Sequence, residues 1–254
     1  MQAAVGTPNP RPWRAYAIEA KFESLRMLRS PAFAGPFLLL PAALYLLFAV
    51  VLFGPALAKD PKTILFMFMG FSIVGVMGPG MFGFGIVVAT ERDQGLLQLR
   101  RALPAPLSAW LVAMMLMSMF FVAIIMGSMA AVAPLGHLHL PGMQLLGISL
   151  VCILGSTPFC ALGFFIGSLA SAKSAPAFVN LLYLPMIYLS GILFPLPRSA
   201  DWIAHLSPAY HLDQIVLTVI GVPHAGNPWI HVAQLAAVAV AFTVLAARRI
   251  TRWA

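Results

Sequence analysis

Charged residues are spread unevenly along the chain and leave five long apolar stretches between them. These stretches run over 30–58, 63–90, 102–172, 174–197 and 214–247. An unpaired charge at the centre of a helix in lipid costs at least about 2.5 kcal/mol, and a helix needs about 20 residues to cross a bilayer. The third stretch is long enough for two crossings, separated by Pro and Gly near 133–142. The pattern predicts six transmembrane helices, at 35–54, 64–89, 107–132, 143–169, 176–194 and 228–247.

The predicted fold is therefore an all-α membrane protein with a single transmembrane domain over 1–254. Composition supports this interpretation, because the chain is 61% hydrophobic and 9% charged. Soluble domains are about 45–50% apolar and about 25% charged. A chain of this composition cannot cover its surface with polar side chains. We expect a multi-pass protein of the plasma membrane, in a bacterium the inner membrane.

The distribution of Lys and Arg predicts the orientation. With the N-terminus inside, only Lys59, Lys62 and Arg198 of the 15 basic residues lie outside, which leaves twelve in the cytoplasm. Cytoplasmic loops carry an excess of Lys and Arg, so both termini are expected inside. The same asymmetry accounts for the net charge of +8, and no nucleic-acid partner is expected.

Two segments are predicted to lie along the membrane. In the cytoplasmic segment 1–31, a helix places Ile18 and Phe22 on one side and Glu19 and Glu23 on another. This pattern fits an interfacial helix and equally fits a positively charged flank without a partner. Outside, 195–227 is too apolar for a loop, and its helix 209–220, ended by Gly221, would reach only about 18 Å. We expect a re-entrant hairpin there; the alternative is a seventh span, which would place the C-terminal arginines outside.

Several kinds of chemistry are missing from the sequence. No Gly-Lys pair exists, so the phosphate-binding loop of an ATPase is absent, and no Asp, Glu or Lys lies within the predicted spans to couple transport to ions. The six histidines fall at the outer rim, where dispersed polarity is favoured over a metal site. Ser190 and His231 lack the motif of an intramembrane serine hydrolase, which leaves that class a weak alternative. No catalytic residue, metal or cofactor is assigned to this chain.

One cytoplasmic loop, 91–104, combines charges with leucines. A short amphipathic helix after Gly95 would present Leu96, Leu99 and Leu103 to one surface and Arg100 to another. A solvated turn would not need those leucines. The loop is therefore suited to transmit force to a soluble partner.

These residues also carry a family resemblance. Glu91-Arg92, Gly95, the leucine-rich turn and Leu103-Pro104 resemble the loop after the second helix in permeases of the ABC-2 type transporter family. Ser-Gly-Ile-Leu-Phe-Pro at 190–195, Asp-Trp-Ile at 201–203 and Ser-Pro-Ala-Tyr at 207–210 are similar to the family's fifth-helix end and outer segment. Gln98 stands where the family often carries an acidic residue. The resemblance covers nearly the whole chain.

The resemblance implies a half-transporter without a motor. Two permease subunits, either two copies of this chain or this chain and a paralogue, would form the conduit in the lipid bilayer. Two copies of a separate ABC ATPase would bind ATP and Mg²⁺. The coupling residues that the resemblance implies are Glu91, Arg92, Gly95, Leu96, Leu99, Arg100 and Arg101. Replacing Glu91 or Arg92 by Ala is expected to lower the turnover of the ATPase.

The resemblance also places the translocation path along the second and fifth helices. The candidate lining residues are Phe82, Asn180, Tyr183, Tyr188 and Ser190. Such walls suggest outward movement of a lipophilic or amphipathic substrate, which could be drug-like, a lipid or a lipid-linked glycan. Gly163 and Gly167 predict a helix-packing contact. The methionines of 114–129 could adapt to varied apolar ligands, but lipid-facing positions or core packing are favoured for them. The competing function is a membrane scaffold or assembly subunit that transports nothing.

Overall fold

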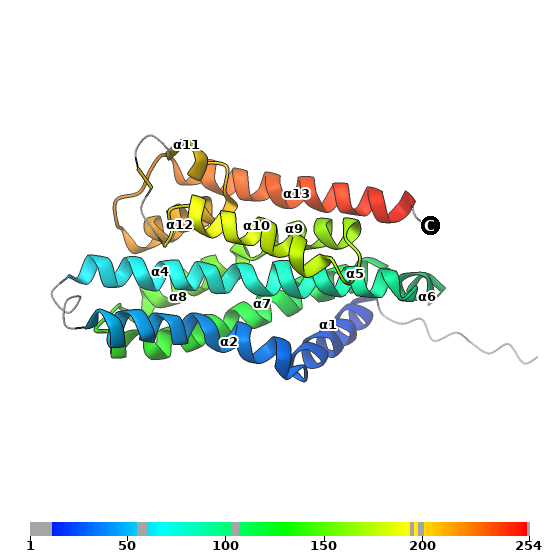
Figure 1. Cartoon of the computed structure of the whole chain (residues 1–254), viewed down its shortest axis with the longest axis horizontal. Coiled ribbons are helices and arrows are strands. Elements are labelled where there is room, and N and C mark those ends of the chain that lie inside the picture. The colour runs from blue at the N-terminus through cyan, green and yellow to red at the C-terminus, as the bar shows by residue number, and fades with distance from the viewer. Residues whose placement is uncertain (1–11, 55–59, 103–106, 194–195, 198–200, 253–254) are drawn as a thin grey trace, which may run out of the picture.

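The computed structural model of the chain describes residues 12–54, 60–102, 107–193, 196–197 and 201–252, and over these residues it contains helices and no strands. The long helices run side by side along one axis (Figure 1). The N-terminal half contains α1 Pro12–Leu28, α2 Pro31–Leu46 with a π-helical turn Leu47–Leu52, α4 Pro61–Gly78, a second π-helical turn Pro79–Phe84, α5 Gly85–Asp93, α6 Leu96–Ala102 and α7 Leu107–Val132. The C-terminal half contains α8 Gly142–Gly155, α9 Thr157–Leu169, α10 Ala175–Leu189, α11 Asp201–Ala204, α12 Pro208–Ile220 and α13 Pro228–Arg252.

Among the described residues, five helical stretches are long and apolar enough to cross a bilayer. They are Ala34–Leu52, Pro61–Asp93, Ser108–Gly136, Gly142–Leu169 and Pro228–Ile250. The fifth predicted span corresponds to α10, which is apolar but has only 15 residues and so extends about 22 Å. Figure 1 shows α1, α6 and the C-terminal end of α13 at one end of the bundle, and α11 and α12 at the other.

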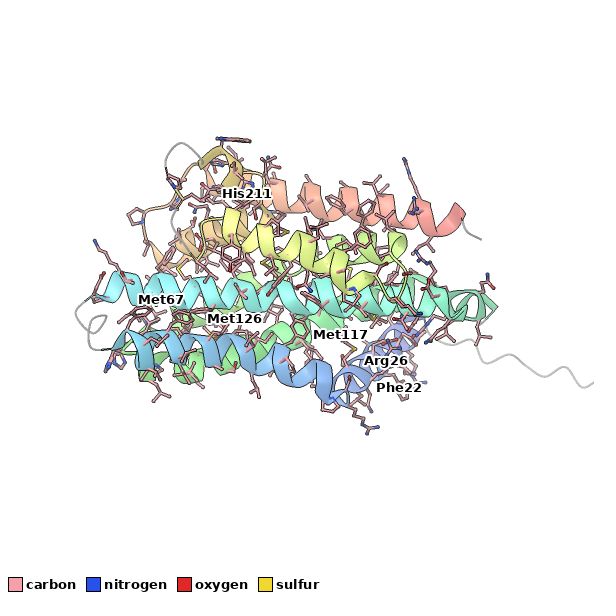
Figure 2. The ribbon with its side chains drawn as sticks, in the orientation of Figure 1. Phe22, Arg26, Met67, Met117, Met126 and His211 are labelled. Atoms are coloured by element: carbon pink, nitrogen blue, oxygen red, sulfur yellow. The ribbon has the colours of Figure 1, made fainter. Side chains whose placement is uncertain are left out.

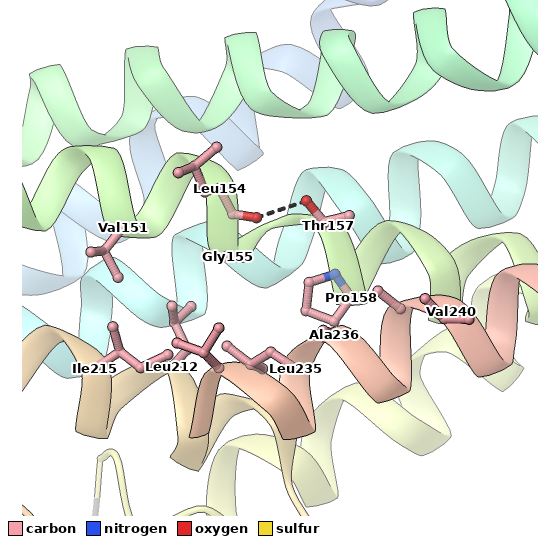
Figure 3. Close-up of a pocket in the computed structure, with 12 residues that line it drawn as sticks. Val151, Leu154, Gly155, Thr157, Pro158, Leu212, Ile215, Leu235, Ala236 and Val240 are labelled. Atoms are coloured by element: carbon pink, nitrogen blue, oxygen red, sulfur yellow. Dashed lines mark hydrogen bonds between the residues drawn. The ribbon is translucent and has the colours of Figure 1, made fainter. Parts of the chain in front are cut away.

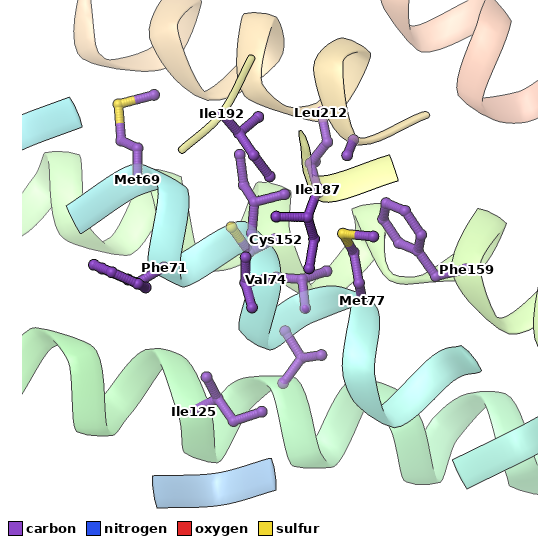
Figure 4. Close-up of a cluster of buried hydrophobic side chains, with 14 of the residues drawn as sticks. Met69, Phe71, Val74, Met77, Ile125, Cys152, Phe159, Ile187, Ile192 and Leu212 are labelled. Atoms are coloured by element: carbon purple, nitrogen blue, oxygen red, sulfur yellow. The ribbon is translucent and has the colours of Figure 1, made fainter. Parts of the chain in front are cut away.

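The second candidate span lies at the centre of the bundle and consists of α4, the π-helical turn and α5. Side chains from α7, α8, α9, α10 and α12 pack around it to form the main core (Figure 4). Residues of this core include Met69, Val74, Met77, Ile125, Cys152, Phe159, Ile187 and Leu212. Met114, Met117, Met126 and Met129 of α7 are also buried, which confirms the packing interpretation for these four methionines.

The closest helix crossing joins α9 to this central span. A Cβ atom added at Gly163 would overlap the carbonyl oxygen of Gly80, and one added at Gly167 would overlap that of Gly85. Only glycine allows the two backbones to approach so closely. The helix-packing contact predicted for Gly163 and Gly167 is confirmed.

This crossing gives a direct test of packing. Gly163→Ala is expected to lower the free energy of unfolding by about 1–3 kcal/mol, since the methyl group must displace backbone. Gly127 lies in α7 with no atom within 4 Å of an added Cβ, so Gly127→Ala should instead raise stability by about 0.5–1 kcal/mol. Thermal unfolding of both variants in detergent measures the difference. Equal effects of the two substitutions would contradict a close crossing.

The outer segment contains one well-formed helix. α12 begins at Pro208 after the N-cap Ser207 and ends at Gly221, whose φ of 77° is the left-handed conformation that ends many helices. The predicted helix end at Gly221 is confirmed. α12 packs against α8, α13 and α4, so protein covers most of its surface. Residues 195 and 198–200 of the predicted outer segment lie outside the described residues.

Candidate functional site

Five charged side chains from α1, α5 and α6 meet at one end of the bundle. Arg26 Nη1 donates to Glu91 Oε1 at 2.8 Å, and Arg100 Nε donates to Glu91 Oε2 at 2.9 Å. Arg100 Nη2 also donates to Glu23 Oε1 at 3.0 Å, while its Nη1 donates to Glu19. We call these five residues the inner ion cluster.

Two carboxylates of the inner ion cluster are removed from solvent, whereas the side chain of Arg26 is 44% exposed. The side chains of Glu23 and Glu91 are each 4% exposed, and that of Arg100 is 23% exposed. Burial raises the pKa of Glu23, while the positive charge of Arg26 opposes that rise. The Arg100 guanidinium also lies 5.1 Å from the centre of the Trp110 ring, a cation–π contact with α7. Arg100 therefore holds α6 to both α1 and α7.

α1 packs Met27 and Glu23 against the protein and leaves part of its apolar surface facing outward. Ile18 and Phe22 are exposed, whereas Glu23 is buried in the inner ion cluster. Figure 2 shows Phe22 and Arg26 at the end of the bundle away from His211. The alternative of a flank without a partner is therefore wrong, since α1 is bound to α5 and α6 through ion pairs.

Arg92 and Asp93 join the end of α5 to the end of α9. Arg92 donates to the carbonyl oxygens of Ser168 at 2.6 Å and Ala170 at 2.7 Å. Asp93 Oδ2 accepts from the backbone N–H of Ala172 at 2.7 Å. The last carbonyls of a helix have no partner within it, so Arg92 supplies donors that α9 itself lacks.

The short helix α6 starts after Gly95, whose φ of 71° reverses the chain at the end of α5. Leu97 is buried, but Leu96 is 37% exposed and Leu99 is 62% exposed. Leu96 and Leu99 stand three residues apart, so their side chains are neighbours on the surface of α6. We call Leu96 and Leu99 the α6 face. The side chain of Arg101, together with Leu103 and Pro104, lies outside the described residues.

The structure thus divides the predicted coupling residues into two groups. Glu91, Arg92 and Arg100 bond to other parts of this chain, whereas the α6 face is open. The sequence analysis did not identify Glu19, Glu23 and Arg26 as their partners. A signal was available, because the chain has only seven acidic residues and two of them stand four apart on one helix.

The predicted path residues lie in different surroundings. The Phe82 and Tyr183 rings are 5.1 Å apart, and the Tyr183 hydroxyl donates to the Val74 carbonyl at 3.1 Å. Asn180 and Tyr188 are exposed on α10. Ser190 is buried and donates to the Ile187 carbonyl at 3.0 Å. Both ring nitrogens of His231 contact groups other than Ser190. Ser190 and His231 therefore do not form the serine–histidine pair of a hydrolase.

Ser190 borders a pocket of about 650 Å³ at the end of the bundle that holds α12. Lys62 and Phe66 of α4 form one wall, and Asp213 and Gln214 of α12 form another. We call this space the outer pocket. Burial raises the pKa of Asp213 from its ordinary 3.8 to about 7. The sequence analysis assigned no role to Lys62 or Asp213, because neither lies in a motif.

The raised pKa of Asp213 predicts a pH-dependent gain in stability for Asp213→Asn. As the pH rises from 3.8 to about 7, the unfolded chain loses this proton while the folded chain keeps it, which destabilises the wild type. The variant should therefore match the wild type near pH 4. Above pH 7 the variant should be more stable than the wild type by about 2 kcal/mol. This value is about half of the free energy that corresponds to the full pKa shift, because part of Asp213 meets solvent. Thermal unfolding across this pH range measures it, and a constant difference would contradict the burial.

A second pocket, of about 460 Å³, lies between the α8–α9 junction, α12 and α13 (Figure 3). At this junction the Thr157 hydroxyl donates to the Leu154 carbonyl at 2.7 Å. The walls are almost entirely apolar and include Val151, Leu212, Leu235 and Val240. This apolar pocket can accommodate hydrocarbon but offers few partners for polar groups.

Comparison with known proteins agrees with this architecture. A model described as ABC-2 type transporter matches residues 15–220. The chain is also 26% identical over 228 residues to the Bacillus subtilis (strain 168) protein named "Putative transport permease YvfS". That alignment covers 88% of this chain and 91% of the Bacillus protein.

Proposed function

Because the chain belongs to the ABC-2 type transporter family, we propose that it is the permease subunit of an ABC exporter. The Bacillus relative is named as a transport permease, which supports a transport role. The substrate we propose is lipophilic or amphipathic: a drug-like compound, a lipid or a lipid-linked glycan. It would move outward across the plasma membrane, in a bacterium the inner membrane.

The observation that carries this proposal is the α6 face. Leu96 and Leu99 are exposed on a short helix that the inner ion cluster holds in place. Such a rigid apolar projection suits a groove on a soluble ATPase, which would bind ATP and Mg²⁺. Glu91, Arg92, Gly95 and Arg100 then act by positioning the helix. Two ATPase copies and a second permease subunit, identical or paralogous, complete the transporter.

The proposed topology has six spans with both termini inside. It needs α10 to cross as well, and the location of α1 and the C-terminal end of α13 at one end of the bundle supports an even number of crossings (Figure 1). The exposed apolar side of α1 would lie on the inner membrane surface. α11 and α12 would form the re-entrant hairpin on the outer face.

Two features support an amphipathic substrate. The outer pocket combines the amine of Lys62 and the carboxyl of Asp213 with apolar walls. The apolar pocket beside α13 offers space for a hydrocarbon chain. Phe82 and Tyr183 lie between the second and fifth predicted spans, where they would line the path before the outer pocket.

Reconstitution in proteoliposomes tests this function. The chain is combined with a phosphate-loop ATPase encoded next to it and supplied with a panel of lipophilic compounds. ATP-dependent flux that is lost without either subunit is the expected result. ATPase binding without flux for any compound would instead support the scaffold. As the resemblance implies, Glu91→Ala and Arg92→Ala should lower the turnover of the ATPase.

A further inference from the structure

Two buried histidines contact each other where α12 meets α13. The Nδ1 atoms of His211 and His231 are 2.8 Å apart. The other nitrogen of each ring faces a backbone carbonyl: His211 Nε2 lies 2.9 Å from the oxygen of His205, and His231 Nε2 lies 2.7 Å from that of Ala225. Both residues are almost fully buried, at 6% and 4% exposure.

These three contacts fix the number of protons on the two rings. A carbonyl oxygen only accepts hydrogen bonds, so both Nε2 atoms must carry a proton and donate it. The 2.8 Å contact between the Nδ1 atoms is a hydrogen bond only if one of them carries a proton as well. Three N–H groups on two imidazole rings give the pair one positive charge.

The two other protonation states conflict with the geometry. If the pair loses its extra proton, two nitrogen lone pairs face each other at hydrogen-bond distance. If it gains another, two N–H groups and two positive charges face each other in a buried site. The singly protonated form is therefore the one that matches all the contacts of the two rings.

We propose that His211 and His231 form a proton-binding site that clamps α12 to α13. The clamp also controls the outer pocket, because Tyr210, Asp213 and Gln214 on the same helix line that pocket. Gln214 Oε1 reinforces the connection by accepting from the Ala225 N–H at 2.7 Å. Either strong acid or alkaline conditions outside the cell would weaken the clamp. This inference does not depend on the transport proposal.

Other titratable groups lie around the pair. The ring of His205, in the turn before α12, lies 6.4 Å from that of His211. The ring of Tyr210, on α12 itself, lies 5.4 Å from it. The Tyr210 ring also lies 6.0 Å from the His231 ring in an edge-on arrangement. Asp213 of α12 and Lys62 of α4 both line the outer pocket. In the α12–α13 connection His224 is exposed, and the sequences of α8 and of α13 before Arg248 contain no Asp, Glu, Lys or Arg.

The shared proton has a direct spectroscopic signature. The full chain is labelled with ¹⁵N-histidine, reconstituted in nanodiscs and treated with chelator. We expect a scalar coupling between two imidazole nitrogens across the hydrogen bond. His231→Gln and His211→Gln should each abolish it, while glutamine keeps a donor near the position of Nε2. The exposed His224→Gln is the matched control and should retain the coupling.

Thermal unfolding across pH supplies the second readout. The wild type and His224→Gln should show a stability maximum that falls on both the acid and the alkaline side. His231→Gln, His211→Gln and the double variant should lose that maximum, with midpoints lowered by similar amounts. Absence of the nitrogen–nitrogen coupling at every pH, or a maximum that persists in both single variants, would overturn the proposal. Restoration of the clamp only by added Zn²⁺ or Cu⁺ would show a metal site instead and would also overturn it.

Discussion

Arg100→Ala should destabilise the protein more than any other single charge removal at the inner end of the bundle. The substitution leaves Glu19, Glu23 and Glu91 with Arg26 as the remaining cation of the inner ion cluster. Removing one partner from a buried ion pair costs several kcal/mol, and here we expect about 2–4 kcal/mol because Arg100 is partly exposed. Differential scanning fluorimetry in detergent should show the melting midpoint lowered by roughly 5–15 °C.

The pH dependence of this defect identifies its cause. Burial already raises the pKa of Glu23, and loss of a nearby cation raises it further. A carboxyl with a raised pKa opposes folding when ionised, so the defect of Arg100→Ala should shrink as the pH falls and the carboxyls become neutral. Lys21→Ala removes an exposed cation on α1, the helix that carries Glu23, and should have little effect at any pH. A defect of Arg100→Ala that is independent of pH would point to lost packing on Trp110.

The positions of the helices could be predicted from the sequence because lipid imposes a simple rule. A charge inside the bilayer is costly, so charge-free stretches mark apolar helices, and α7 has the predicted bounds of 107–132. α10 is harder, since it ends at Leu189 and has 15 residues where the pattern indicated 176–194. Ser190 and the positive φ of Gly191 end that helix, a local effect that hydropathy does not register.

The internal bonding of the candidate site could not be predicted in the same way. Glu91 and Arg92 are charged residues in a cytoplasmic loop, and such residues usually face solvent. Here Glu91 is buried because α1 brings Arg26 against it, although the two residues are 65 positions apart in the sequence. The pairing of His211 with His231 depends likewise on the crossing of α12 and α13. Periodicity identifies the side of a helix but not the element that covers it.

Leu99→Glu should abolish ATPase coupling without unfolding the permease. Leu99 is 62% exposed on the α6 face, so a glutamate there meets solvent in the free protein and costs little stability. In the proposed complex the same position would lie in an apolar groove. Losing a buried leucine costs about 1.5–3 kcal/mol, and burying an unpaired carboxylate adds to that. We expect the dissociation constant for the ATPase to rise at least tenfold, measured by microscale thermophoresis in nanodiscs, together with loss of substrate-stimulated ATP hydrolysis.

Gln98→Glu is the matched control for this prediction. It adds the same charge one residue away on the same exposed helix but keeps Leu96 and Leu99. ATPase binding should persist in Gln98→Glu, because acidic residues are frequent at this place in the family that the loop resembles. Equal losses in the two variants would mean that the ATPase responds to charge on α6 and not to its leucines. Normal binding and turnover in Leu99→Glu would place the ATPase contact elsewhere on the inner end of the bundle, since a buried carboxylate at the interface could not leave the affinity unchanged.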